Sequence, residues 1–225
     1  MVCVKIKLMQ KKSILIIFCS ILVGFFGFFA FRVVWVHYEQ SKEVFASVEI
    51  HKVLNPPQGS LIASVTNLSG EVEKEGRLDT KFHDITTQTT LLEGESLIAS
   101  DSGSVNVAFN NNVNLSLSNN TELDYLNALP NALVVRQPTG TITYATSTIT
   151  RPFSIRSLGL LTQLASQSNI TIATDTNAQM VTVTINNGTA TLAYSDQNDD
   201  TQVEKLAQGQ TAIFDNNAST LTLQQ

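Results

Sequence analysis

The sequence predicts an all-β fold, an antiparallel β-roll or sandwich of short strands with one short helix, preceded by a single transmembrane α-helix. Three observations support this: an uncharged apolar run near the N-terminus, alternation of apolar and polar residues beyond residue 60, and Gly or Asn between the alternating runs. We therefore expect a cytoplasmic tail (1–12), a transmembrane helix (13–36), a stalk or linker (37–60) and an extracytoplasmic β-domain (61–225).

The predicted anchor begins with residues 13–31, which contain no charged side chain. At about 1.5 Å per residue this run spans just under 30 Å, the thickness of the hydrocarbon core of a bilayer. Arg32 can extend to the interface, where Trp35 and Tyr38 suit an aromatic belt. Four lysines precede the run and orient the N-terminus towards the cytoplasm: Lys5, Lys7, Lys11 and Lys12. We expect residues 13–36 to contact the lipid bilayer in a single pass of the cell membrane.

Three alternatives to an uncleaved anchor are weaker. A cleavable signal peptide would have a shorter apolar region and an A-x-A-like site, but Phe28 lies two positions before Ala30. A lipoprotein anchor would not place its cysteine, Cys19, in the middle of the run. A type IV pilin would carry a glutamate early in the apolar stretch, and this chain has none there.

A break at residues 55–59, Asn-Pro-Pro-Gln-Gly, separates the stalk from the β-domain, because proline lacks the amide donor and restricts its predecessor. Residues 105–109 and 113–117 alternate in the same sense around an Asn turn, which predicts a hairpin. Two further strands, 133–135 and 141–144, are expected on either side of Pro138 and Gly140. Residues 180–185 lead into Asn-Gly at 187–188, the strongest short hairpin signal, and residues 189–194 are expected to return beside them.

The one predicted helix covers residues 157–166. Leu160, Leu161 and Leu164 have the spacing of one helical face. The remaining alternating segments, including 61–65, 211–214 and 221–223, favour strands.

Charge is distributed unevenly along the chain. Beyond Arg32 there are nine basic against nineteen acidic residues, a net charge of −10. Such an acidic domain repels phosphate backbones, so nucleic-acid binding is not expected. The only cysteines, Cys3 and Cys19, precede the domain, so neither a disulfide nor a thiolate site is expected within it.

Two local patterns recur along the domain. Residues 92–95, Leu-Glu-Gly-Glu, are echoed by 206–210, Leu-Ala-Gln-Gly-Gln, and the glycine-led strand 103–109 is echoed by 188–194. A glycine between short strands suits a backbone position with positive φ. The echoes predict similar turns but are too degenerate for a solenoid.

The run LLEGESLIASDSGSVNVAFNNNVNLSLSNNTEL at residues 91–123 resembles the FecR-like domain family. Gly70-Glu71-Val72 is similar to the family's first strand, and residues 185–190 and 206–210 are similar to its closing elements. The resemblance covers most of residues 61–214. It implies an extracytoplasmic, all-β module of a bacterial envelope protein.

Regulatory members of that family relay the state of an outer-membrane receptor to a sigma factor through a cytoplasmic anti-sigma domain. Residues 1–12 are far shorter than the ~50 residues of an independent domain. Direct control of a sigma factor by this chain is therefore not expected.

No catalytic, cofactor or metal site is predicted, and an enzyme is not expected. The histidines His37, His51 and His83 are not at ligand spacing. His83-Asp84 with Ser100, Ser102 or Ser104 would resemble a hydrolase triad, but no G-x-S-x-G motif accompanies them.

Three acidic segments have simpler explanations than a site. Glu71, Glu73 and Glu75 alternate as the solvated face of a strand would, as do Glu93 and Glu95. Residues 196–200 are rich in oxygen ligands but lack the glycine and closing glutamate of a calcium loop, which favours an acidic hairpin tip.

The sequence therefore predicts a binding or scaffolding protein of the bacterial cell envelope, with an envelope protein or a cell-wall polymer as partner. The alternative is a signalling component that senses through the β-domain and acts through a separate membrane partner.

Overall fold

The computed structural model describes residues 56–79, 81–110, 112–127 and 132–224. All of them belong to one compact unit, Lys52–Gln225. The predicted tail, the anchor and nearly all of the stalk lie outside the described residues. Within the described part of the chain, no helix has the length and apolar character needed to cross a membrane.

The described chain is all-β, as the alternation predicted. It contains these strands: β1 (Ala63–Ser69), β2 (Val72–Glu75), β3 (Phe82–Asp84), β4 (Thr89–Leu91), β5 (Ser96–Ala99), β6 (Ser104–Phe109), β7 (Val113–Leu117), β8 (Thr121–Asn127), β9 (Leu133–Thr146), β10 (Phe153–Ser157), β11 (Leu160–Leu164), β12 (Asn169–Asp175), β13 (Met180–Asn187), β14 (Thr189–Ser195), β15 (Thr201–Ala207), β16 (Thr211–Asp215) and β17 (Thr220–Gln224).

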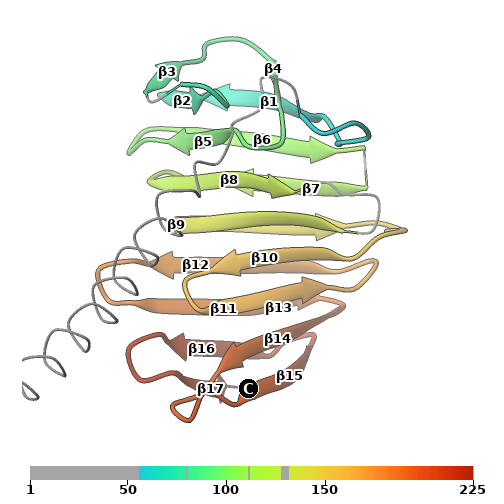
Figure 1. Ribbon diagram of the computed structural model, residues 1–225, viewed down its shortest axis with the longest axis vertical. Coiled ribbons are helices and arrows are strands. Elements are labelled where there is room, and N and C mark those ends of the chain that lie inside the picture. The colour runs from blue at the N-terminus through green and yellow to red at the C-terminus, as the bar shows by residue number, and fades with distance from the viewer. Residues whose placement is uncertain (1–55, 80, 111, 128–131, 225) are drawn as a thin grey trace, which may run out of the picture. The chain divides into compact units, whose positions relative to one another are not determined.

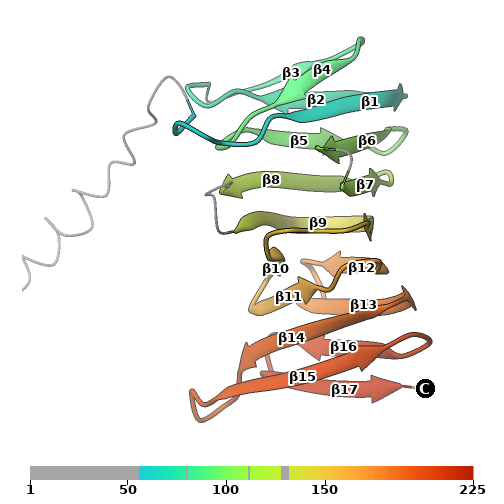
Figure 2. The ribbon, with the colours of Figure 1, turned by 90° about the vertical axis from the view of Figure 1, so that its right-hand side faces the viewer.

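The strands form two sheets that pack face to face (Figures 1 and 2). Sheet A has the order β4-β1-β6-β7-β9-β12-β13-β16-β17. Sheet B has the order β3-β2-β5-β8-β9-β10-β11-β14-β15. All pairs are antiparallel except β9–β10, which is parallel. The sheets thus extend together, from β1–β4 at one end to β14–β17 at the other.

The core lies between the sheets and is built from alternate residues of nearly every strand. The alternation in β6, with Val105, Val107 and Phe109 buried between part-exposed residues, is typical. Phe109 makes an edge-on contact with Tyr125 of β8, with ring centroids 4.9 Å apart. Because each strand has one buried face, a one-residue slip would expose its apolar side chains, and the alternation therefore fixes the register.

Strand β9 belongs to both sheets. Its first residues pair with β8 and β10 in sheet B, and residues 140–145 pair with β12 in sheet A. The crossing is held by Gln137, which is fully buried and donates from Nε2 to the carbonyls of Gly140 (2.8 Å) and Ile172 (3.0 Å). The hydroxyl of Tyr144 donates to Gln137 Oε1 at 2.9 Å, and burial raises the pKa of Tyr144 well above its usual value. The two strands expected on either side of Pro138 and Gly140 are therefore one strand that changes sheets.

The predicted helix at 157–166 is wrong: these residues end β10, turn, and form β11. Leu158 adopts φ +50° in the turn, and the amide of Gly159 donates to Asn216 Oδ1 at 3.0 Å. As a strand, the segment pairs with both β10 and β14 and buries Leu160 and Leu164, each worth about 1.5–3 kcal/mol when fully buried. Leu161, which completed the helical pattern, points outward and is 39% exposed.

The hairpin predicted at 187–188 is also wrong, although a turn is present. Residues 187–188 connect β13 in sheet A to β14 in sheet B, and these strands pair with other neighbours. The reason is that the inner faces of both strands must meet across the core, which a hairpin within one sheet would prevent.

Two local predictions are confirmed. Strands β6 and β7 form the expected hairpin. The echoed turns at residues 92–95 and 207–210 have the same geometry, with Gly94 at φ +84° and Gly209 at φ +85°. In each turn the last amide donates to the first carbonyl, at 3.0 and 3.1 Å. The first amide donates to the side-chain oxygen of the last residue, at 2.7 and 2.8 Å.

Candidate binding surfaces

The structure does not assemble the hydrolase triad that the sequence could suggest. His83 lies in β3, is largely exposed, and has its Nε2 3.9 Å from Asp79 Oδ2. Ser104 begins β6 in sheet A and pairs with Ser69 of β1, whereas β3 is at the edge of sheet B. His37 and His51 lie outside the described residues.

The solvated face expected for Glu93 and Glu95 is wrong, because both residues are buried. Glu93 accepts a hydrogen bond from the Ser60 hydroxyl, and Glu95 is paired with Lys74.

Two of the other acidic residues expected on a solvated face, Glu71 and Glu73, come together with Asp84. Carboxylate oxygens of Glu71, Glu73 and Asp84 lie within 4.8 Å of one another, because Glu73 is directly opposite Asp84 in the β2–β3 pair. Exposed acidic groups of this kind need no ion to be stable. The register between β2 and β3 was the missing information, since the sequence alone does not bring residue 84 beside residue 73.

The acidic segment at 196–200 forms the tip between β14 and β15, as predicted. The Asp196 carboxylate accepts hydrogen bonds from the amides of Asn198 (2.8 Å) and Asp200 (3.1 Å) and from Gln202 Nε2 (2.8 Å). These bonds, led by the one from Asn198, lower the pKa of Asp196. Its oxygens thus serve to close the turn.

The outer face of sheet B carries further charged groups near the middle of the sheet. Arg136 Nε donates to Asp124 Oδ2 at 2.6 Å, and the neighbouring strand places Arg156 directly beside Arg136. Glu122, half-buried on the same strand as Asp124, has a raised pKa, chiefly through burial and then through repulsion by Asp124.

The outer face of sheet A is uncharged along one continuous row that crosses seven strands. Its members are paired in register and consist of Thr66, Asn106, Ser116, Thr143, Thr171, Thr184 and Thr211. Neighbouring hydroxyls hydrogen-bond at 3.2 Å, between Thr143 and Thr171 and between Thr184 and Thr211. Threonine favours strands and cross-strand Thr pairs stabilise sheets, so the row supports the fold whether or not it binds a ligand.

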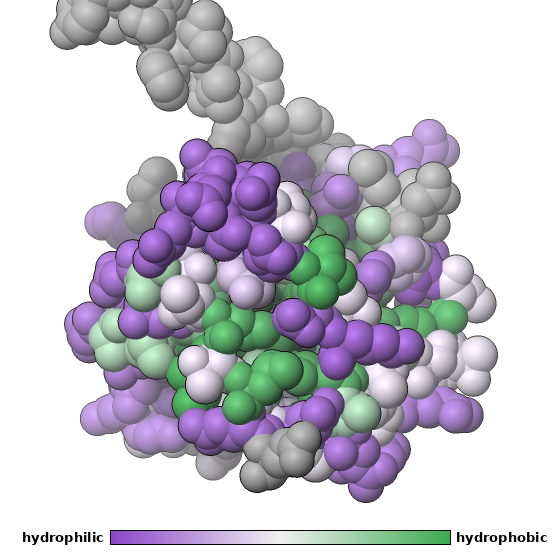
Figure 3. Space-filling model, turned by 90° about the horizontal axis from the view of Figure 1, so that it is seen from below, coloured by the Kyte–Doolittle hydropathy of each residue, from purple (hydrophilic) through white to green (hydrophobic). Residues whose placement is uncertain are grey.

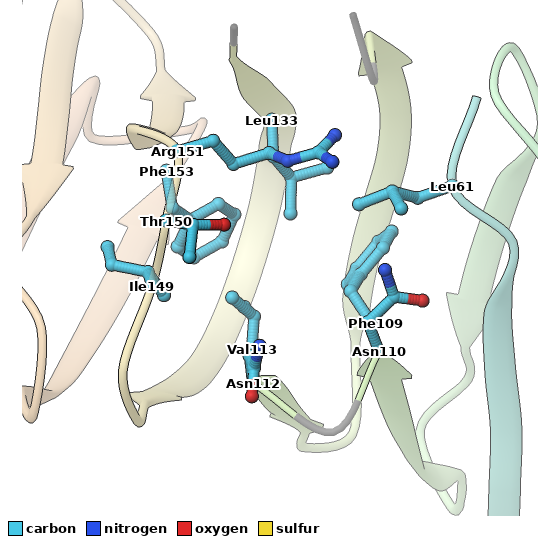
Figure 4. Close-up of a pocket in the computed structure, with 10 residues that line it drawn as sticks. All are labelled: Leu61, Phe109, Asn110, Asn112, Val113, Leu133, Ile149, Thr150, Arg151 and Phe153. Atoms are coloured by element: carbon cyan, nitrogen blue, oxygen red, sulfur yellow. The ribbon is translucent and has the colours of Figure 1, made fainter. Parts of the chain in front are cut away.

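A pocket opens on one side of the domain, with about 380 Å³ of empty space that includes part of the open solvent (Figure 4). Its walls mix apolar and polar side chains and come from four separate segments: Leu61, Phe109, Asn110, Asn112, Val113, Leu133, Ile149, Thr150, Arg151 and Phe153. Arg151 supplies the one charged side chain of this lining. Arg151 also lies near Tyr125, whose pKa is raised by burial and by Glu93 and lowered in part by Arg151. The pocket offers apolar side chains, amide and hydroxyl groups and one cation.

The two ends of the sandwich differ. At the β1–β4 end, Lys74 is on the inner face, opposite Leu97, and its Nζ lies 3.0 Å from both Glu95 Oε2 and the carbonyl of Thr90. At the β14–β17 end, Figure 3 shows an apolar area rimmed by hydrophilic residues. Leu221 and Leu223 of β17 lie opposite Phe214 and Ala212, and hence on the inner face, yet Leu223 is 47% exposed. Such an area marks a surface that a partner could cover.

Comparisons with known proteins give similarity at the level of the fold. Two crystal structures, at 2.50 and 1.65 Å resolution, are each provisionally described as an anti-sigma factor from Parabacteroides distasonis ATCC 8503. Each has a TM-score of 0.50 and 11% sequence identity, over 57% of this chain and 58% of that chain. No family model and no curated protein matches the chain. This chain therefore shares a β-architecture with part of those structures.

Sequence reasoning missed the apolar end of the sandwich and the pocket. The alternation in residues 221–223 was visible, but it did not show that the inner side of this strand is left partly uncovered. The pocket lining is spread over residues 61–153, and no local pattern joins those segments.

Proposed function

We propose that this chain is a non-enzymatic, membrane-anchored regulator of the bacterial envelope, which binds through its β-domain and acts through a separate membrane partner. The observation that carries the proposal is the likeness of the β-domain to part of two structures provisionally described as anti-sigma factors. The resemblance of residues 91–123 to the FecR-like domain family also supports it. The strands of this run, β5 to β8, lie in the half of the domain nearer the β1–β4 end.

A scaffolding role is the second candidate, favoured by the outer face of sheet A. The hydroxyl and amide side chains of its central row can hydrogen-bond to a neutral polymer of the cell wall. The row carries no charge, whereas the chain beyond Arg32 has a net charge of −10. Hydrogen bonding to a neutral polymer does not depend on charge, so the acidity of the rest of the domain does not oppose it.

The test is an affinity purification with the full tagged chain from envelope solubilised in mild detergent. The matched control is a tagged fragment that consists of residues 1–60 alone. Proteins that bind this fragment are partners of the anchor or stalk and are subtracted. Reproducible retention of one integral membrane protein by the full chain supports the signalling proposal. Retention of cell-wall polymer or of a surface protein supports scaffolding, and retention of nothing beyond the control contradicts both.

A further inference from the structure

We propose that the outer edge of β17 binds an extended segment of a partner protein, which adds a strand to sheet A and brings a basic residue to Glu204. The proposal rests on the proposed binding function and identifies where and how a protein partner attaches.

The first step is a comparison of the four edge strands among the described residues. Strands β3 and β4 are edges of three residues each. Strand β15 is longer, but it carries Glu204 and Lys205. Short edges and charged edges are two of the devices by which proteins prevent unwanted strand pairing. The sequence of β17, Thr-Leu-Thr-Leu-Gln, is uncharged and has neither device.

The second step concerns the side of β17 that would be covered. Its amide and carbonyl groups pair with β16 on one side, and no described strand pairs with the other side. Leu221 and Leu223 face the interior, where an added strand would complete the layer that now leaves Leu223 47% exposed. Strand addition supplies backbone hydrogen bonds along the edge, while alternate side chains of the added segment enter the apolar space.

The third step identifies the charge of the partner. Glu204 is opposite Leu192, which is fully buried, so its side chain is on the inner face of sheet B. At the other end of the domain, the inward Lys74 is paired with Glu95. Glu204 is exposed and has no ion pair among the described residues. A lysine or arginine on the added segment would complete the equivalent pair.

The fourth step decides against a second copy of this chain as the occupant. Residues 195–224 carry five carboxylates and one basic side chain, Lys205; the acids are Asp196, Asp199, Asp200, Glu204 and Asp215. Two identical ends would bring these carboxylates together, including the inward Glu204 of both copies. Like charges placed together across an interface suppress that pairing, whereas a basic segment is complementary.

The experiment places a photo-reactive amino acid at Thr222 in the full chain, expressed in its native envelope. Thr222 is on the outer face of β17, and Thr182 of β13 is the matched control, since both pair with Ile213 in one row. A partner that lies across the sheet face would be captured from both positions. A strand added at the edge is expected to be captured from position 222 only.

The expected product is one partner peptide that alternates apolar and polar residues and contains a lysine or arginine. Glu204→Gln is expected to lower the cross-linking yield about tenfold, as for a charge pair lost from an interface. Lys205→Gln, on the same strand but on its outer face, is expected to leave the yield unchanged. Both positions are exposed, and circular dichroism checks that the fold is retained.

Four outcomes would overturn the proposal: equal capture at positions 182 and 222, capture of a second copy of this chain, a captured segment without basic residues, or a yield insensitive to Glu204→Gln. If the affinity purification retains a membrane protein while position 222 captures nothing, the binding function stands and only the β17 site fails.

Discussion

At the scale of single residues, threonine has opposite roles on the two faces of the sheets. On the outer face of sheet A, threonine hydroxyls bond to one another. On the inner faces, each buried hydroxyl needs a partner, and Thr146 has them: its Oγ1 donates to the carbonyl of Ala165 at 2.7 Å and accepts from the amide of Ser168 at 3.0 Å. Thr162 is fully buried, and its Oγ1 has no hydrogen-bond partner.

Replacing Thr162 with valine is therefore expected to stabilise the fold. Valine has nearly the same shape as threonine and lacks the hydroxyl, which is desolvated in the folded chain without gaining a hydrogen bond. The free energy of unfolding should therefore rise by about 1 kcal/mol. Thr146→Val is the matched control and should lower it by about 1–3 kcal/mol, because it leaves the amide of Ser168 without its acceptor. Urea denaturation followed by circular dichroism measures both. A destabilised Thr162→Val variant would show that the hydroxyl has a partner after all.

Glu122 gives a pH dependence with a defined sign. Burial raises its pKa in the folded state, so the folded chain holds this proton more tightly than the unfolded chain does. The stability that this group contributes is present below its unfolded pKa and is lost as the pH rises through the folded value. Glu122→Gln is thus expected to stabilise the fold at neutral pH by less than about 1 kcal/mol, given its partial exposure, and to bring no gain in acid. Urea denaturation midpoints of the two proteins, measured from acid to neutral pH, check this prediction. A gain in stability that grows towards acid pH would contradict the raised pKa of Glu122.

At the scale of secondary-structure elements, β9 is the strand on which the two-sheet arrangement depends. Its crossing requires Gly140 at φ +88°, with β8 so close that an added Cβ would lie 2.4 Å from the Cα of Thr121. Gly209 has nearly the same φ, +85°, but open space around it.

Alanine substitutions at Gly140 and Gly209 separate the cost of backbone strain from the cost of steric contact. Gly209→Ala is expected to cost about 1–2 kcal/mol, the penalty of the left-handed conformation alone. Gly140→Ala carries the same penalty and must also move β8 away from β9, so its cost should be larger. Thermal unfolding of the two variants gives the comparison. An equal loss of stability in the two variants would mean that β8 and β9 can move apart without a cost in free energy.

The elements also show how far the sequence predicts this structure. The β6–β7 hairpin was predictable because both strands and their turn are contiguous. Residues 157–166 were not, because leucines at 160, 161 and 164 satisfy a helical period, and positions 160, 162 and 164 equally satisfy a strand. Pairing with β14, thirty residues later in the chain, decides between them. The turn at 187–188 was located correctly, but the sheet that each flanking strand joins depends on distant partners.

At the scale of the whole molecule, the membrane anchor expected at residues 13–36 remains a prediction, and fractionation tests it. Deletion of residues 13–36 is expected to move the chain from the membrane fraction, where alkaline carbonate does not extract it, to the soluble fraction. The physical reason is that the uncharged run is much more stable in the bilayer than in water. Without it, only surface contacts of the β-domain could hold the chain at the membrane. Deletion of residues 41–54 is the control and should leave the chain in the membrane. Carbonate extraction of the full chain would contradict the transmembrane prediction.

The asymmetry between the two ends leads to a prediction about assembly. The inward Glu204 is expected to keep two copies from joining end to end, because pairing their uncovered layers would bring two carboxylates into one apolar interior. Glu204→Val removes that obstacle and should convert a monomer into a concentration-dependent dimer, measured by sedimentation of the full chain in detergent. Lys205→Val adds the same apolar side chain to the outer face of the same strand, where it should leave the assembly state unchanged.

If both variants stay monomeric, the apolar end is too small to drive association. If both associate, hydrophobicity rather than the position of the charge controls it. Dimerisation by Glu204→Val alone would show that the inward carboxylate is what prevents two copies from pairing at this end of the sandwich.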